Sequence, residues 1–189
     1  MKKYELTNEA KVERGVTLHR IRALVDIERW EIKAGDLGGW IESEANLSQE
    51  HDAWVSDEAW VFGKAWVSDE AWVFGKARVS DEAWVSGEAR VFGEAWVFGK
   101  ARVSGNAWVY RTDHVLTVGP IGSRDDTTTF FRVKFSAGFA ISVCCGCFRG
   151  TVDEFRAKVK QTHGDNKHGK AYQLAADLAE AQIDLGEEG

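Results

Sequence analysis

Residues 52–76 read DAWVSDEAWVFGKAWVSDEAWVFGK, a stretch in which nearly the same twelve residues occur twice. Each twelve-residue unit is built from two similar six-residue units of the form x-Ala-[Trp/Arg]-Val-[Phe/Ser/Tyr]-[Gly/Asp/Arg]. This unit occurs ten times between Asp52 and Arg111, always with alanine second and valine two positions later. A period of six does not match the 3.6-residue period of an α-helix, but it fits a short strand followed by a corner.

The direction of the side chains follows from alternation along a strand, which places Ala and Val on one side and the residues between and after them on the other. We expect Ala and Val to point inward, because the seven Trp and five other aromatic residues of these units would not fit inside a narrow coil. Gly and Asp at the corners suit tight turns, since both tolerate left-handed backbone angles.

The pattern resembles the hexapeptide-repeat family, whose unit has an aliphatic residue at i and a small residue at i+4, as in Val55 with Ala59 and Val61 with Ala65. In that family three units form one triangular turn of a left-handed parallel β-helix. The resemblance therefore implies a mainly β fold with this architecture, and the left hand comes from the family alone.

A turn of eighteen residues would stack residue i on residue i+18, about 4.8 Å apart. The charged corner residues then alternate in sign, in the columns Glu58, Lys76, Glu94 and Lys64, Glu82, Lys100. The outward columns Trp60, Arg78, Trp96 and Trp72, Arg90, Trp108 would each place an arginine between two indoles, a cation–π arrangement worth about 0.5–2 kcal/mol. These six residues are candidate binding residues, although a solvated, stacked face explains them equally well.

Three segments are expected, namely an N-terminal β cap (1–40), the repeat coil (41–111) and a C-terminal α+β domain (112–189). Ile41, Ala45 and Leu47 extend the inward pattern upstream, and two extra residues near 49–51 should bulge from a corner. The aromatic surface is too large for a soluble monomer to leave open, so we expect a homo-oligomer, dimer or trimer, or a partner protein. The column Ser68, Ser86, Ser104 marks the flattest face, expected to be exposed or closely packed by another backbone.

The segment after Tyr110 predicts a β-hairpin followed by two helices. Alternation predicts one apolar hairpin face, formed by Phe131, Val133, Phe135, Phe139, Ile141, Val143 and Cys145. TVDE at 151–154 has the form of a capping box that opens a helix ending near His163. A second helix at about 166–185 has an apolar face predicted from its helical spacing, formed by Leu174, Leu178, Ala181 and Leu185.

The three cysteines lie together in VCCGCF at 144, 145 and 147, and we expect buried free thiols in a reducing compartment. No metal or cofactor is expected, because the spacing of His163 and His168 is unlike that of zinc ligands. The net charge of −6 without a basic patch argues against duplex nucleic acid. No apolar run approaches the ~20 residues that span a bilayer, and the N-terminus does not resemble a secretory signal, so a cytoplasmic location is expected.

The combination of the repeats with RIRALVDI upstream and TVGPIGSRDD downstream is similar to hexapeptide-repeat proteins encoded in bacteriophages and prophages, which places the expected location in the cytoplasm of a host bacterium. Acyltransferases of the hexapeptide family use a coil histidine as general base. The ten units here contain no histidine, and only His51 and His114 flank them. Acyl transfer would therefore require a displaced site.

The loop 119–126 combines two glycines with Ser123, Arg124 and Asp125, and such a loop could hold an anion or be a satisfied turn. The leading hypothesis is a non-enzymatic phage or prophage binding protein that inhibits a host factor or defence system through the coil surface or the C-terminal module. Its partner could be a host protein or a small nucleotide. The alternatives are a self-associating or virion-linked structural module, and an acyltransferase with a displaced site.

Overall fold

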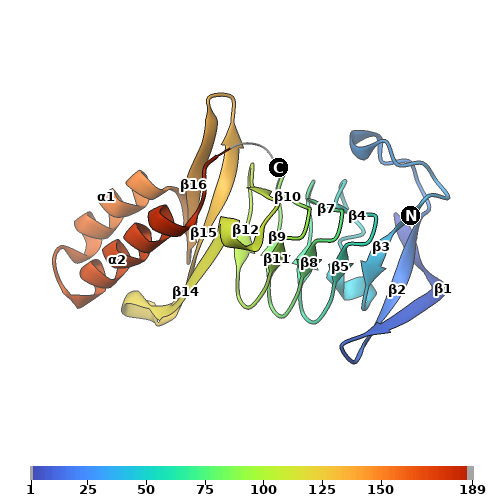
Figure 1. The fold of residues 1–189 in the computed structure, drawn as a ribbon, viewed down its shortest axis with the longest axis horizontal. Coiled ribbons are helices and arrows are strands. Elements are labelled where there is room, and N and C mark those ends of the chain that lie inside the picture. Colours follow the sequence, from blue (N-terminus) through green and yellow to red (C-terminus); the bar gives the residue numbers. More distant parts are fainter. Residues whose placement is uncertain (1, 187–189) are drawn as a thin grey trace.

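A computed structural model describes residues 2–186 of the protein and shows a parallel β-solenoid between an N-terminal hairpin and a C-terminal α+β module (Figure 1). The hairpin and the module lie at opposite ends of the solenoid axis. The fold is thus mainly β, as predicted.

Ten two-residue strands, one from each repeat unit, form the solenoid. They are β4 (Trp54–Val55), β5 (Trp60–Val61), β6 (Trp66–Val67), β7 (Trp72–Val73), β8 (Arg78–Val79), β9 (Trp84–Val85), β10 (Arg90–Val91), β11 (Trp96–Val97), β12 (Arg102–Val103) and β13 (Trp108–Val109). Together with β3 (Leu37–Ile41) they make three faces, here named the β4 face (β4, β7, β10, β13), the β5 face (β3, β5, β8, β11) and the β6 face (β6, β9, β12).

Each strand pairs in parallel with the strand three units later. Trp60 is in register with Arg78, and Arg78 with Trp96. The Trp60 N–H donates to the Ala77 carbonyl at 2.9 Å, and the same bond recurs around the coil. The Ala and Val of all ten units are at most 1% exposed. The eighteen-residue turn and the inward assignment of Ala and Val are both confirmed.

The corners are joined by a second ladder. Asp57, Asp69 and Asp81 adopt positive φ, and each carboxylate accepts a hydrogen bond at 2.9–3.0 Å from the backbone N–H of the glycine eighteen residues later. These glycines also have positive φ, where a side chain would add strain. At these three corners the Asp carboxylate and the Gly backbone N–H therefore join one turn to the next.

The two extra residues predicted at 49–51 are visible in the register. Ile41 pairs with Val61 and Leu47 with Val67, so the separation across this bulge is twenty residues instead of eighteen. The prediction for Ala45 is wrong, because a short 3-10 turn, η2 (Glu44–Asn46), exposes Ala45 and buries Asn46 in its place. The Asn46 amide donates to the carbonyls of Gly63 and Ala65 at 3.0 Å.

The N-terminal residues cover one end and two sides of the coil. Strands β1 (Tyr4–Glu13) and β2 (Val16–Ala23) form an antiparallel hairpin, and β2 pairs with β3. Residues 24–36, here named the strap, follow β2 and contain the short 3-10 helix η1 (Glu28–Trp30). This confirms a β cap, extended by the strap along the coil.

The C-terminal module is a four-stranded antiparallel sheet with two helices. Its strands are β14 (Val115–Ile121), β15 (Asp126–Phe135), β16 (Gly138–Cys145) and β17 (Phe148–Thr151), in that order, with the 3-10 turns η3 (Thr112–His114) and η4 (Gly122–Arg124) beside β14. The helices α1 (Val152–His163) and α2 (Lys167–Gln182) follow.

The predicted single apolar face of the hairpin is wrong, because both faces of this sheet are buried. Phe130 pairs with Val143 and packs on the helices, whereas Phe131 and Val133 face the solenoid core. Phe135 is exposed. When both faces of a sheet are buried, neither face is polar, so the alternation of apolar and polar residues does not show which side chains share a face.

The helix bounds agree closely with the predictions, and Thr151 and Glu154 form the predicted capping box. The predicted apolar face of α2 is wrong: Leu174, Leu178 and Leu185 are exposed, as is Ala181. Tyr172 and three alanines, Ala175, Ala176 and Ala179, make the buried face instead. Within residues 2–186, no helix has the length and apolar character required to cross a membrane.

A third ladder links tryptophans to serines of the preceding turn. The indole N–H groups of Trp72, Trp84 and Trp96 donate to the hydroxyls of Ser56, Ser68 and Ser80, at 2.8, 3.3 and 2.9 Å. Each serine lies sixteen residues before its tryptophan. The outward aromatics are thus held by side-chain hydrogen bonds as well as by stacking.

Ser80→Ala should lower the free energy of unfolding by about 0.5–1.5 kcal/mol, because the substitution removes the acceptor of the Trp96 indole N–H. Ser86→Ala is the matched control, since Ser86 follows Val85 as Ser80 follows Val79 and its side chain forms no hydrogen bond with any residue of the described range 2–186. Urea denaturation followed by tryptophan fluorescence measures both. Equal effects of the two substitutions would contradict a role for this hydrogen bond.

Candidate functional site

The first predicted aromatic column lies on the β5 face and is covered by the N-terminal hairpin. The Arg78 guanidinium lies 4.6 Å from the centre of the Trp60 ring, as predicted. The guanidinium nearest to the Trp96 ring, at 5.4 Å, belongs to Arg14 in the hairpin turn. Lys11 of the hairpin lies 4.9 Å from the Trp60 ring. Among the described residues, Arg78 is within cation–π distance of Trp60 but not of Trp96, so only one half of the expected sandwich is formed, and Arg14 of the hairpin occupies the other indole.

The second predicted column lies on the β4 face and is covered by the strap. Trp30 stacks on Trp72 at 4.7 Å, and its indole N–H donates to the Asp52 carbonyl at 2.8 Å. The Arg90 guanidinium lies between Trp30, at 5.1 Å, and Trp108, at 5.0 Å. Trp30 thus takes the place that the sequence assigned to Trp72, and this column is also occupied from within the chain.

The β6 face is the most open of the three. Trp84 is 43% exposed, and the Arg102 side chain above it is also exposed. In the serine column of this face, Ser68 is buried under the Trp84 indole, and the Ser104 hydroxyl lies 3.5 Å from the Cys144 sulfur. The aromatics of the solenoid are therefore mainly structural, and only a small part of them is accessible.

A pocket of about 190 Å³ lies in the C-terminal module, between the η4 turn, the β16–β17 turn and the two helices. Its floor is apolar and is made by Phe155 and Val159 of α1, Phe148 of β17 and Tyr172 of α2. The helix α1 places Phe155 and Val159 four residues apart, so both side chains point to the same side. This floor belongs to the smaller of the two cores and is held in place by it.

Cationic and polar groups surround the mouth of the pocket. They are Arg124 from η4, Lys158, Thr162 and His163 from α1, Ser123, and the single carboxylate Asp126. Within residues 2–186, neither Arg124 nor Lys158 forms an ion pair; Lys158 donates only to Gln161, at 3.2 Å. The mouth therefore combines an apolar floor with a surplus of positive charge.

Gly122 of η4 packs against Tyr172, which lines the pocket. Its φ is +78°, and an added Cβ would overlap the Tyr172 hydroxyl. Burial raises the pKa of Tyr172 to about 12, and the Cys145 thiol next to the hydroxyl acts in the same direction. Tyr172 is therefore a neutral hydrogen-bonding group at neutral pH.

The pocket contains one thiol that is half-buried and one that is exposed. Cys145 contacts the Tyr172 hydroxyl and accepts a hydrogen bond from Thr128 at 3.1 Å, whereas Cys147 is exposed at the turn. Only Cys144 is buried, so the prediction of three buried thiols is wrong for the other two. The partners of Cys145 are hydroxyl groups, which do not activate a thiol as a basic residue does.

Of the loop residues predicted to hold an anion, Ser123 and Arg124 line the pocket, and Asp125 does not. Asp125 has a φ of +47° at the end of η4 and is exposed, and Asp126 takes its place in the lining. Lys158, His163 and Tyr172 also line the pocket and were not among the predicted site residues. The capping box had placed α1 correctly, so Lys158 and His163 were on a known helix, but nothing in the sequence brought that helix to the loop.

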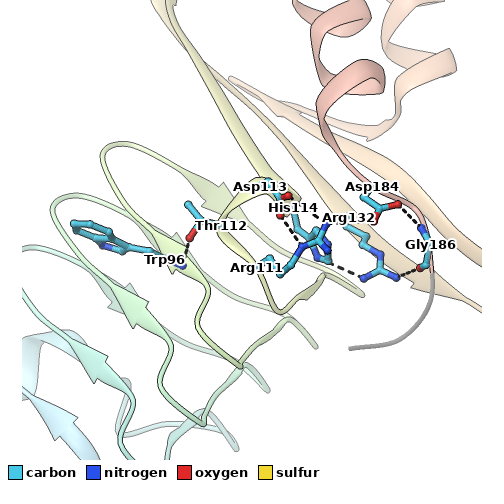
Figure 2. A network of polar contacts seen from close by, with 8 residues as sticks. All are labelled: Trp96, Arg111, Thr112, Asp113, His114, Arg132, Asp184 and Gly186. Atoms are coloured by element: carbon cyan, nitrogen blue, oxygen red, sulfur yellow. Dashed lines mark hydrogen bonds and ion pairs between the residues drawn. The ribbon is translucent and has the colours of Figure 1, made fainter.

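A separate polar cluster joins the solenoid to the module and to the end of α2 (Figure 2). Arg111 binds Asp113 at 2.9 and 3.2 Å and Asp184 at 3.2 Å. Arg132 is fully buried, lies 3.5 Å from the centre of the Phe139 ring, and donates to the Gly186 carbonyl. These contacts fix the segment after α2 against the last coil, which is a structural role.

His114 is buried in this cluster. Its Nδ1 lies 3.4 Å from an Arg132 Nη1, and its ring is edge-on to Tyr110 at 4.4 Å. Burial, together with the charges of Arg132 and Arg111, lowers the pKa of His114 to about 4, against the opposing effect of Asp113 and Asp184. A neutral imidazole can accept a hydrogen bond from the Arg132 guanidinium at Nδ1, so the folded state favours the uncharged ring.

No family model and no curated protein matches this chain. The family resemblance in the repeat units therefore stands on the residues themselves. Within residues 2–186, no group of three or more His, Cys, Asp or Glu residues is arranged to hold a metal ion.

The free energy of unfolding should fall between pH 6.5 and pH 4, by at most about 3 kcal/mol from His114 alone. In this range the unfolded histidine binds a proton and the folded one does not, so lower pH favours the unfolded chain. His114→Gln keeps an uncharged acceptor. The difference in free energy of unfolding between wild type and this variant, measured by urea denaturation, should change with pH in this window only. A difference that stays constant from pH 4 to pH 7 would contradict the prediction.

Proposed function

We propose that the protein is a binding protein whose C-terminal pocket holds a small organic anion. The observation that carries this proposal is the placement of Arg124, Lys158 and His163 around the mouth of a pocket with an apolar floor. Guanidinium and ammonium groups without ion pairs within the described chain are available to a carboxylate or phosphate, for which arginine offers paired donors.

The size and walls of the pocket restrict the ligand further. A volume of about 190 Å³ takes a small group rather than a large cofactor. The rings of Phe148 and Phe155 line the floor, so the anionic group should be attached to a ring or a short apolar body. A phosphate or carboxylate on a planar ring, as in a nucleotide fragment, has this chemistry.

Binding fits the pocket better than catalysis does. The Cys145 thiol is in contact with Tyr172 and Thr128, and among residues 2–186 no hydrogen bond joins it to His163 or to another base that could remove its proton. Acyl transfer at a displaced site has no observation in its favour. We extend the proposal, from the resemblance to phage-encoded repeat proteins, to the capture of an anionic signal of a host bacterium, which would inhibit the host system that uses it.

The proposal is tested with the whole protein and a deproteinised bacterial extract. The protein is incubated with the extract, washed and denatured, and the released small molecules are identified by mass spectrometry. Wild type should enrich a low-mass anion, and Arg124→Ala should lose most of it, because the substitution removes a cation from the mouth of the pocket.

Arg22→Ala is the matched control, since Arg22 is an exposed arginine on β2 at the other end of the molecule. This variant should enrich the anion as wild type does. Enrichment of no compound by wild type, or equal enrichment by Arg124→Ala, would overturn the proposal. Circular dichroism of both variants confirms that loss of the ligand is not loss of the fold.

A further inference from the structure

Three repeat units carry an arginine in place of the outward tryptophan, and one of these arginines is held by two rings. Arg90 of β10 lies over the indoles of Trp30 and Trp108, at 5.1 and 5.0 Å from the ring centres. Arg102, in contrast, is exposed and lies 5.8 Å from the centre of the Trp84 ring. The two indoles therefore fix the position of the Arg90 guanidinium on the β4 face.

The hydrogen-bond donors of Arg90 are unused within the described chain. Stacking covers the two faces of a guanidinium, whereas its five N–H groups point outward in its plane. Among residues 2–186, the Arg90 side chain forms no hydrogen bond and no ion pair. Arg90 is thus a positioned set of charged donors that lacks an acceptor.

A pocket of about 220 Å³ lies beside Arg90, where the last coil meets the C-terminal sheet. It is lined by Glu88, Arg90, Asn106, Ala107 and Trp108 of the coil and by Lys134 of β15. The Lys134 Nζ lies 4.3 Å from the centre of the Trp108 ring. Glu88 is the one carboxylate in this lining.

A second guanidinium adds positive charge next to the pocket. Arg29 of the strap is ion-paired to Glu88 at 3.2 Å. Burial lowers the pKa of Arg90, and the charge of Arg29 acts in the same direction, against the opposing effect of Glu88. The two arginines therefore share one carboxylate, which is itself 60% exposed. An anion bound between them would offset the repulsion of the two like charges.

We propose that this pocket binds a phosphate group through the Arg90 guanidinium, with the charge of Arg29 beside it. Two N–H groups of one arginine can donate to two oxygens of a phosphate at once, a geometry that lysine does not offer. The volume of the pocket takes such a group with a short substituent rather than a whole nucleotide. The ligand is accordingly inorganic phosphate or the phosphate of a small ester.

This site is separate from the pocket beside η4, because no residue lines both. We expect a dissociation constant for phosphate on the order of 1 mM. A site of that affinity releases its ligand during washing, so it does not contribute to the extract experiment. Failure of either proposal therefore leaves the other one standing.

Titration of the whole protein with inorganic phosphate, at constant pH and ionic strength, tests the site by ¹H–¹⁵N NMR. The variant Arg124→Ala is the parent for every substitution below, so that the pocket beside η4 does not contribute. The indole N–H signals of Trp30 and Trp108, assigned by substitution of each with Phe, should shift and saturate. Glycerol 3-phosphate in place of phosphate shows whether the free anion or an ester binds more tightly.

Two substitutions should weaken binding. Arg90→Gln should bind phosphate at least about 10-fold more weakly than the parent, because the paired donors are lost. Arg29→Gln should bind at least about threefold more weakly. The Arg29 side chain is 36% exposed and belongs to the strap, so this second variant tests the site without disturbing the coil. Circular dichroism checks the fold of both.

A third substitution should strengthen binding. Glu88→Gln removes the carboxylate that competes for the two arginines, so it should bind phosphate about threefold more tightly. A purely structural role of the ion pair between Arg29 and Glu88 predicts no such gain. Arg102→Gln is the matched control and should leave binding unchanged, because Arg102 has the same place in its repeat unit and lies outside the pocket.

Several results would overturn the proposal. The first is the absence of a saturable shift with about 20 mM of either phosphate compound. The second is binding of acetate as tight as that of phosphate, since the site would then not be one for a phosphate group. The third is binding that is unchanged in both Arg90→Gln and Arg29→Gln.

Discussion

The backbone ladder between turns is the constraint on which the structure depends. Each strand is only two residues long, so a single strand pair contributes little to stability. The coil is held together because backbone N–H groups of one turn donate to carbonyls of the next. Examples are the N–H of Trp60 to the carbonyl of Ala77 and the N–H of Trp72 to that of Ala89, both at 2.9 Å. This spacing is kept only if the inward side chains are small and uniform, which Ala and Val provide. Every larger side chain of the repeat is consequently forced outward.

The outward aromatics would leave a large apolar surface exposed to solvent, and the N-terminal hairpin and strap cover much of it. The hairpin brings Lys11 and Arg14 to the indoles of the β5 face, and the strap brings Trp30 to those of the β4 face. An apolar and cationic surface that resembles a binding site is in this way used to attach the cap to the coil. The accessible chemistry is then found mainly at the other end, in the module with its pocket and at the junction of this module with the last coil.

The parts of the fold that local periodicity controls could be predicted from the sequence. The inward Ala and Val, the eighteen-residue turn, the bulge before Val55 and the capping box at Thr151 all depend on neighbours in sequence or on exact repetition. The faces of β15 and α2 could not be predicted. Phe130 and Phe131 are both buried because the sheet lies between the coil and the helices, and Ala176 is buried in preference to Leu178 because the helix lies close to the sheet.

The candidate site shows the same division. Arg124 and Ser123 were predicted from their loop, whereas Tyr172 reaches the pocket only through tertiary packing and has no local signal. Trp30 is a similar case on the coil. It lies in a non-repetitive segment, and nothing in its sequence neighbourhood indicates that it stacks on Trp72.

The repeat of the sequence and the turn of the coil have different lengths, and this difference sets how such a chain can grow. The sequence of residues 52–76 repeats after twelve residues, whereas the strands stack after eighteen, which is one and a half repeats. The first six residues of one repeat therefore stack on the last six residues of the following repeat. That offset puts Gly75 over Asp57 and Gly99 over Asp81. Insertion of one twelve-residue unit would rotate the C-terminal module by two thirds of a revolution about the coil axis. Insertion of three such units makes two full turns, which restores its orientation and moves it outward by about 10 Å. Duplication of repeat units can therefore change the orientation of the C-terminal module about the coil axis, or its distance from the N-terminal cap, without any other change in sequence.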